Sequence, residues 1–133
     1  MSSGNIQLVQ GLYAAFKRGD IAPIVAAMAT DVAWTVHGRP KDHPAMGTTT
    51  APAGVQKFFG IIADTQTPTD FSPREFYTAG DKVFVLGSYT LKMKKTGKPV
   101  ACEWVHVFTF RDGKVTHWRE HTDTAQFAEA WRA

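Results

Sequence analysis

The sequence predicts an α+β fold in which helices pack on one face of a curved antiparallel sheet. In the first half of the chain, apolar residues recur at the spacing of helices in three segments. The second half consists mostly of extended segments that are joined by turn sequences. The chain has 133 residues, of which 44% are hydrophobic, so we expect residues 1–133 to form one domain with its own core.

The predicted helices cover residues 5–18, 21–28 and 53–65, and a short fourth helix covers residues 125–132. Gly19 ends the first helix, and Asp20 can cap the second, which carries Pro23 in its first turn. Asp123 or Thr124 stands at the expected N-cap of the last helix.

The predicted strands cover residues 31–36, 70–78, 82–93, 100–110 and 115–122. Residues 79–81, 95–98 and 111–114 have the composition of hairpin turns. Residues 37–52 form a long irregular segment with three prolines, which indicates a functional or mobile loop. We expect His37 and His43 in this loop either to gate a pocket or to face solvent.

Composition excludes several classes of function. A net charge of +3 without a basic stripe between exposed aromatic residues argues against nucleic-acid binding, and no apolar run is long enough to span a membrane. A single cysteine, Cys102, and an N-terminus without a signal-peptide pattern favour a cytoplasmic protein. His117 and His121 would lie about 13 Å apart along a strand, so we expect no metal site, and without a phosphate-binding glycine loop we expect no cofactor.

Several stretches resemble the nuclear transport factor 2-like superfamily, which includes SnoaL-like and steroid isomerase-like domains. They are residues 12–20 (LYAAFKRGD), 31–34 (DVAW), 108–115 (FTFRDGKV), 118–120 (WRE) and 123–124 (DT). They span nearly the whole chain. The resemblance implies a cone-shaped, cystatin-like domain with three N-terminal helices on its sheet. It also implies a homodimer through the outer face of the sheet, where Val105, Val107 and Thr109 would lie.

The chemistry implied by the resemblance depends on the residues at three family sites. At the tyrosine and aspartate of steroid isomerases this chain has Leu12 and Val36, and at the arginine and aspartate of limonene epoxide hydrolases it has Tyr89 and Leu91. Neither chemistry is expected. The histidine and acidic residue of SnoaL-type polyketide cyclases are similar to His106 and Glu120, with Glu replacing Asp.

The register of the last hairpin decides whether these two side chains meet. If residues 111–113 form a three-residue loop, residue 110 faces 114, and His106, opposite Trp118, shares a face with Glu120. If Asp112 and Gly113 form a two-residue turn, His106 shares its face with Arg119 and His121 instead. The first register fits the family pattern.

In the first register the sheet and the helices enclose a pocket for a small apolar organic ligand. His106 and Glu120 are the predicted catalytic residues, and the predicted ligand-binding residues are Tyr13, Phe16, Met28, Trp34, Phe58, Phe59, Ile62, Trp104, Phe108 and Trp118. Burial among these rings should raise the pKa of the carboxyl group and fit it for acid–base chemistry.

The predicted function is therefore cofactor-independent isomerisation, cyclisation or hydration of a small apolar carbonyl compound. Two alternatives stay open: a binding module for a hydrophobic ligand without chemistry, and a dimeric scaffold whose pocket is only core. In the alternatives His106 is a buried histidine with satisfied hydrogen bonds, or Glu120 pairs with a surface cation.

Overall fold

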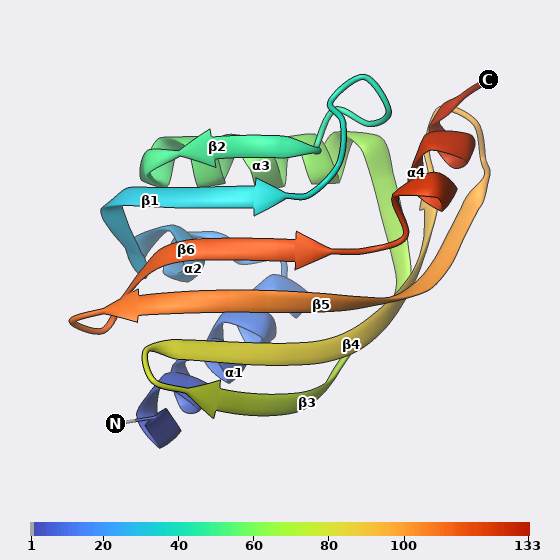
Figure 1. The fold of residues 1–133 in the computed structure, drawn as a ribbon. Helices are drawn as coiled ribbons and strands as arrows, with labels where there is room; N and C mark the ends of the chain where they lie inside the picture. Colours follow the sequence, from blue (N-terminus) through green and yellow to red (C-terminus); the bar gives the residue numbers. More distant parts are fainter. Residues whose placement is uncertain (1) are drawn as a thin grey trace.

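A computed structural model describes residues 2–133 (Figure 1). Its elements follow in the order α1 (Ser2–Lys17), α2 (Ala22–Ala26), β1 (Met28–Val36), β2 (Gly47–Thr50), α3 (Ala51–Thr65), β3 (Gln66–Ala79), β4 (Lys82–Met93), β5 (Pro99–Arg111), β6 (Lys114–His121) and α4 (Thr124–Trp131). The α+β class predicted from the sequence is confirmed. Asp123 caps α4, because its carboxylate accepts the backbone N–H of Gln126.

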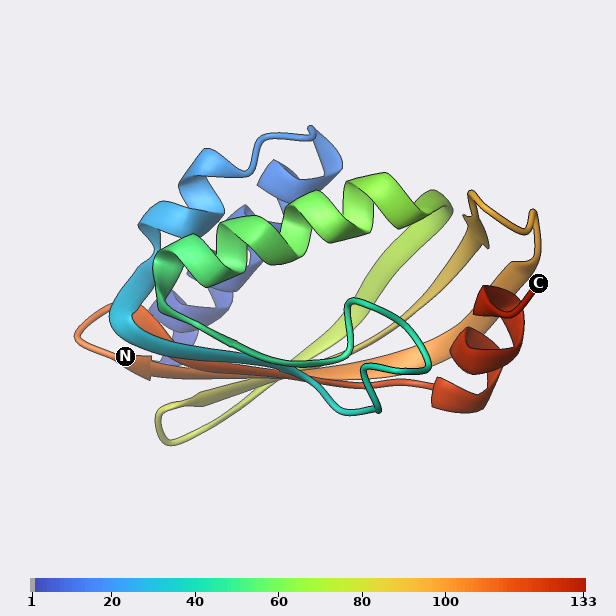
Figure 2. The same cartoon turned by 90° about the horizontal axis from the view of Figure 1, so that it is seen from above.

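The six strands form one open, curved sheet in the order β2-β1-β6-β5-β4-β3. Figure 2 shows that α1, α2 and α3 lie together on one face of the sheet, while α4 lies at one end. The sheet is mixed rather than antiparallel throughout, because β1 pairs with β6 in parallel.

Several predicted boundaries are wrong, and β3, for instance, begins at Gln66 rather than at residue 70. Met28 was placed on the second helix but begins β1, because the N–H of Val115 on β6 donates to the carbonyl of Ala27 at 2.9 Å and ends the helix there. The segment 37–52 is not wholly irregular, since residues 47–50 form β2 against β1. Its threonines favour an extended backbone.

The core lies between the helices and the inner face of the sheet. Trp34 of β1 and Trp118 of β6 are direct neighbours in the parallel pair, and their rings stack with centroids 4.1 Å apart. Phe58 and Phe59 of α3 pack edge-on against Trp34. None of the helices described is both long and apolar enough to cross a membrane.

Candidate active site

A β-bulge in β6 brings His106 and Glu120 face to face. Arg111 pairs with Lys114, so the hairpin has the two-residue turn of Asp112 and Gly113, as in the second register considered above. Phe110 pairs with Val115, but the next residue of β5, Thr109, pairs with His117. Thr116 is therefore an extra residue of β6 that has no partner on β5, which makes a β-bulge. Beyond the bulge His106 pairs with Glu120 and Phe108 with Trp118. The prediction that His106 and Glu120 lie on one face of the sheet is thus correct. Neither of the two registers considered from the sequence is the observed one.

His106 is held between a tyrosine and a carboxylate. Its Nε2 lies 2.9 Å from Oε2 of Glu120, and its Nδ1 lies 2.8 Å from the hydroxyl of Tyr13 on α1. A carboxylate only accepts hydrogen bonds, so Nε2 carries the proton, and Nδ1 of the neutral ring accepts from the tyrosine. Both ring nitrogens are therefore satisfied, although His106 is only 4% exposed.

Glu120 is also bound from the next strand. The hydroxyl of Tyr89 on β4 lies 3.3 Å from Oε2 of Glu120 and 2.7 Å from the hydroxyl of Thr122. The Thr122 hydroxyl in turn contacts Sγ of Cys102 at 3.3 Å. Within residues 2–133 the contacts of His106 and Tyr89 with Glu120 both reach Oε2, and no group donates to Oε1. One carboxylate oxygen is anchored and the other is available to a bound molecule.

Burial determines the protonation of this network. It lowers the pKa of His106, an effect that the hydrogen bond to Glu120 partly offsets, so the ring is neutral at neutral pH. Burial, together with the negative charge of Glu120, raises the pKa of Tyr13 and of Tyr89. Both phenols therefore remain protonated donors, and Glu120 is the proton acceptor of the group.

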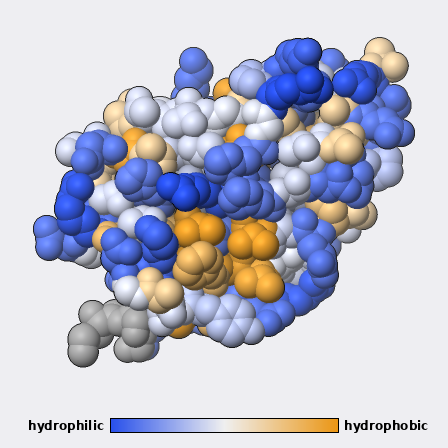
Figure 3. Space-filling view, viewed as in Figure 1, coloured by the Kyte–Doolittle hydropathy of each residue, from blue (hydrophilic) through white to orange (hydrophobic). Residues whose placement is uncertain are grey.

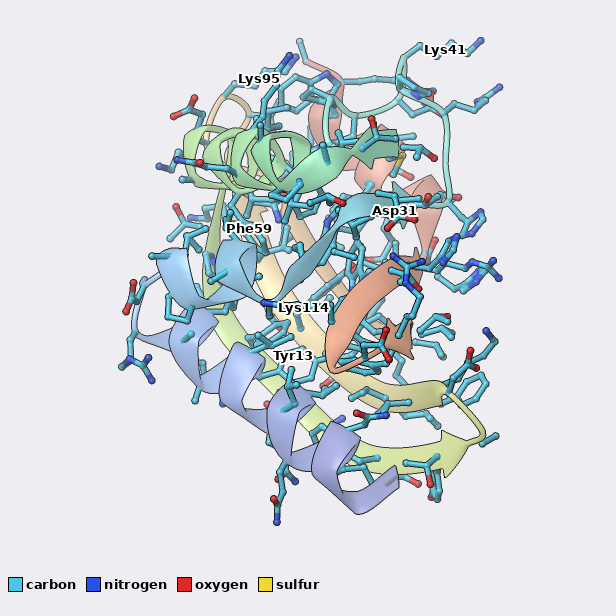
Figure 4. The ribbon with its side chains drawn as sticks, turned by 90° about the vertical axis from the view of Figure 1, so that its left-hand side faces the viewer. Tyr13, Asp31, Lys41, Phe59, Lys95 and Lys114 are labelled. Atoms are coloured by element: carbon cyan, nitrogen blue, oxygen red, sulfur yellow. The ribbon has the colours of Figure 1, made fainter. Side chains whose placement is uncertain are left out.

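A cavity of about 100 Å³ opens beside this network. Figure 4 shows Tyr13 and Phe59 in the layer between helices and sheet. The lining residues are Leu12, Tyr13, Phe16, Ile24, Trp34, Val36, His43, Ala45, Met46, Phe58, Phe59, Ile62, Gln66, Pro68, Phe71, Tyr89, Leu91, His106, Phe108, Trp118, Glu120, Thr122 and Phe127. The walls are mostly apolar, and the volume fits a molecule smaller than the ligands of typical sites, which occupy roughly 300 Å³ or more.

Eight of the ten predicted ligand-binding residues line this cavity, and Met28 and Trp104 do not. Met28 is buried near the turn between α2 and β1, outside the cavity wall. Trp104 lies behind His106, and the two rings stack with centroids 3.8 Å apart. Its indole is thus a support for the histidine rather than part of the wall.

Sequence reasoning missed three polar residues of the wall, namely Tyr89, Gln66 and Thr122, and it left His43 open between a pocket and solvent. Tyr89 could have been found from its alternation on β4, which places residues 85, 89 and 91 on the inner face. Gln66 and His43 come from a helix end and a loop, where no periodicity indicates a direction. For the loop histidines His37 and His43 the sequence left open a place at a pocket or a place in solvent. His37 is exposed, whereas His43 is 1% exposed and faces the cavity.

Among the residues that the structure describes, no three histidine, cysteine or acidic side chains gather closely enough to hold a metal ion. His117 and His121 point outward on β6, together with Arg119. The polar groups of the cavity are thus a carboxylate, two imidazoles, two phenols, a threonine hydroxyl, two indoles and an amide. Such a set can accept a proton and donate hydrogen bonds.

The fold and the cavity define an α+β pocket protein of the nuclear transport factor 2-like class. A model of the SnoaL-like domain matches residues 9–118, and the chain belongs to that family. No curated protein matches the sequence.

Solved structures are similar over nearly the whole chain. A nuclear transport factor 2-like protein from Burkholderia xenovorans is 30% identical, with a TM-score of 0.89, and the match covers 99% of this chain and 98% of that one. A nuclear transport factor 2-like protein from Burkholderia pseudomallei is 28% identical, with a TM-score of 0.86, over 97% and 98% of the two chains. TerC, co-crystallised with polyporic acid, is 30% identical, with a TM-score of 0.81, over 95% and 96%.

Proposed function

We propose that this protein is a cofactor-independent acid–base enzyme that isomerises, cyclises or hydrates a small, largely apolar carbonyl compound. The observation that carries the proposal is the pairing of His106 with Glu120 at the wall of an apolar cavity, with Oε1 of the carboxylate left without a donor. The family match and the co-crystallisation of TerC with polyporic acid support a small-molecule function.

In the proposed reaction Oε1 of Glu120 removes a proton from a carbon atom next to the carbonyl group. The electron pair of the broken C–H bond moves to the carbonyl oxygen as an enolate. The proton returns to the same carbon or to another one; in ring closure the enolate carbon instead bonds to a second carbonyl carbon of the molecule, and the oxygen of that group takes the proton. In hydration Glu120 takes a proton from water, the water oxygen bonds to the carbonyl carbon, and the carbonyl oxygen takes the proton. His106 orients the carboxylate through Oε2, and the hydroxyl of Tyr13 fixes the tautomer of His106.

The experiment that tests this function is hydrogen–deuterium exchange at the α-carbons of cyclohexanone in D₂O, followed by NMR. Exchange needs only the base and not the natural substrate. We expect the wild-type protein to accelerate exchange, and Glu120→Gln to lose this acceleration by about 10² or more, because the amide cannot accept the proton.

The matched control is Glu103→Gln, since Glu103 is an exposed glutamate on the outer face of β5. It should exchange cyclohexanone at the wild-type rate. Equal rates for wild type and Glu120→Gln would reject the enzyme. If cyclohexanone then still bound, the protein would be a binding module, which is the alternative that a small and mostly apolar cavity favours.

We also propose that residues 1–133 act as one domain and that it forms a homodimer. Figure 3 shows hydrophobic side chains gathered on the outer face of the sheet and surrounded by hydrophilic ones. Leu86 of β4, which is 37% exposed, pairs there with Val105 of β5, and Phe84 pairs with Val107. A second copy would cover these side chains on both partners. Sedimentation equilibrium should give a dimer for wild type and a monomer for Val107→Glu, and a monomeric wild type would reject the dimer.

A further inference from the structure

Five buried side-chain atoms among the described residues have no hydrogen-bond partner: Nε1 of Trp34, Nε2 of His43, Oγ1 of Thr49, Oε1 of Gln66 and Nε1 of Trp104. A buried polar atom without a partner costs about 1–3 kcal/mol, so each of them needs an explanation. Three of these side chains line the cavity, namely Trp34, His43 and Gln66. Nε1 of Trp34 always carries a proton and Oε1 of Gln66 only accepts, whereas the proton of His43 has to be placed from its contacts.

The tautomer of His43 follows from one backbone contact. The N–H of Ala45 donates to Nδ1 of His43 at 3.0 Å, so Nδ1 has no proton. Burial holds the pKa of His43 at about 4, although the charge of Glu120 acts in the opposite direction, and the ring is therefore neutral at neutral pH. A neutral ring that accepts at Nδ1 carries its proton on Nε2. His43 thus presents a buried N–H donor that is without an acceptor.

The loop that carries His43 is anchored. Asp42, which is 8% exposed, accepts from Nε of Arg39 at 2.9 Å and lies 3.5 Å from Nη2 of Arg132. The imidazole packs against Phe127 and Trp131 of α4, with ring centroids 5.6 Å and 5.0 Å away. The ring is held on both sides, which opposes turning Nε2 toward another acceptor.

Water is a poor partner for this donor. A buried water needs two to four polar contacts, and the cavity walls are mainly apolar. A ligand that fills the cavity and carries an oxygen atom satisfies the donor and also covers the apolar walls. The carboxylate of Glu120 lines the same cavity, so one ligand can reach both groups.

We propose that Nε2–H of His43 donates a hydrogen bond to the carbonyl oxygen of the bound molecule, and thereby selects ligands that carry a neutral carbonyl or an enolate oxygen. The assignment rests on the proposed function and deepens it, because a donor at this oxygen stabilises the charge that forms when Glu120 removes the proton. Asp42 is a positioning residue, which acts through the loop.

The test compares the binding of two molecules of the same shape, cyclohexanone and methylenecyclohexane, which differ in having C=O or C=CH₂. Dissociation constants are measured by NMR titration for wild type and for His43→Phe. The ratio of the hydrocarbon constant to the ketone constant should fall about tenfold in the variant, because the ketone alone loses a hydrogen bond. A general effect of the variant on the cavity changes both dissociation constants alike, so it does not change their ratio.

His37→Phe is the matched control, because His37 belongs to the same loop but is exposed and stacks on His121 at 4.5 Å. It should leave the ratio unchanged. Glu120→Gln should also keep the ratio while it loses exchange, so that this inference and the proposed function fail separately. An unchanged ratio in His43→Phe, or wild type that binds neither molecule, would overturn the proposal.

A second measurement covers the case that His43→Phe does not fold. In wild type labelled with ¹⁵N at histidine, cyclohexanone should move the ¹H and ¹⁵N resonances of Nε2–H of His43 toward those of a hydrogen-bonded donor. Methylenecyclohexane should not do so. Equal shifts with both molecules would reject the hydrogen bond to the carbonyl oxygen.

Discussion

The hydroxyl of Tyr13 lies 2.8 Å from Nδ1 of His106, although the two residues are 93 positions apart in the chain. Their rings are also close to parallel, with centroids 5.9 Å apart. The contact joins α1 to the middle of the sheet and fixes the tautomer that donates to Glu120. It couples the packing of the first helix to the orientation of the carboxylate.

Tyr13→Phe removes this donor and keeps the ring in place. We expect Nδ1 of His106 to lose its partner, at a cost of about 1–3 kcal/mol in the free energy of unfolding. We also expect exchange of cyclohexanone to fall about tenfold, because the imidazole no longer has one fixed tautomer. Urea unfolding and the ¹⁵N spectrum of His106 measure the two effects. Tyr77→Phe is the control, since Tyr77 is 53% exposed and distant from the cavity.

Tyr89→Phe tests the support of Glu120 from β4. The substitution removes the hydroxyl that contacts both Oε2 of Glu120 and Thr122. Because Oε2 then loses one of the groups that hold it, the carboxylate is less well oriented and exchange of cyclohexanone should fall about tenfold. NMR measures the exchange rate. An unchanged rate, with normal stability, would show that the Tyr89 hydroxyl serves packing only.

Deletion of Thr116 tests the bulge. Without Thr116 the residue after Val115 is His117, so the regular ladder still pairs Thr109 with His117 and His106 with Glu120. We expect cyclohexanone exchange to be retained, because Glu120 stays on the inner face. Thr116→Val keeps the residue count and should retain the bulge and the pairing, which NMR contacts between β5 and β6 can check. Loss of exchange in the deletion, with the pairing retained, would show that the bend made by the bulge also orients Glu120.

This bulge shows where sequence reasoning reaches its limit. The alternation of Trp104, His106 and Phe108 with outward residues follows from the period of a strand, and it is correct. The pairing between strands depends on whether one residue is left over, and nothing in the stretch Lys114 to His117 indicates that it is. Two adjacent residues, Val115 and Thr116, are buried, which only the folded sheet reveals.

The same reasoning explains why the sequence left His43 open between a pocket and solvent. A loop residue has no periodicity, and its direction here is set by Asp42 with Arg132, which lies 90 positions away in the sequence. The aromatic residues of α3, by contrast, were placed correctly in the cavity wall, because helical spacing defines one face. Local patterns thus predicted the walls, while long-range contacts decided the polar groups.

His43 should make stability depend on pH. Its pKa is about 4 in the folded protein, against an ordinary value of 6.5. Between these values the unfolded chain binds a proton that the folded chain does not, so stability is lost as the pH falls from 6.5 toward 4 and is fully present above 6.5. The loss is at most about 3 kcal/mol.

Urea unfolding of wild type and His43→Phe at about pH 7 and about pH 4.5 measures this effect. The free energy of unfolding should fall more steeply for wild type, because the variant lacks the titrating ring while all other groups are shared. Parallel losses in the two proteins would mean that His43 is protonated as easily in the fold as outside it.

A single methyl group at Gly87 should displace Trp104, which supports His106 on the side away from the cavity. A Cβ atom at Gly87 would lie 2.5 Å from Cζ2 of Trp104 and 2.6 Å from the carbonyl oxygen of Ser72. The indole packs over this glycine and stacks on His106, so Gly87→Ala must move either the strand or the ring. We expect a loss of about 1–3 kcal/mol in the free energy of unfolding.

The same displacement should weaken exchange of cyclohexanone, because His106 loses its support. Gly60→Ala is the control, since a Cβ atom at Gly60 meets no atom within 4 Å and alanine favours the helix α3. It should leave exchange unchanged and stabilise the protein slightly. Normal stability with normal exchange in Gly87→Ala would mean that Trp104 can shift without moving His106, and that the histidine is held by Tyr13 and Glu120 alone.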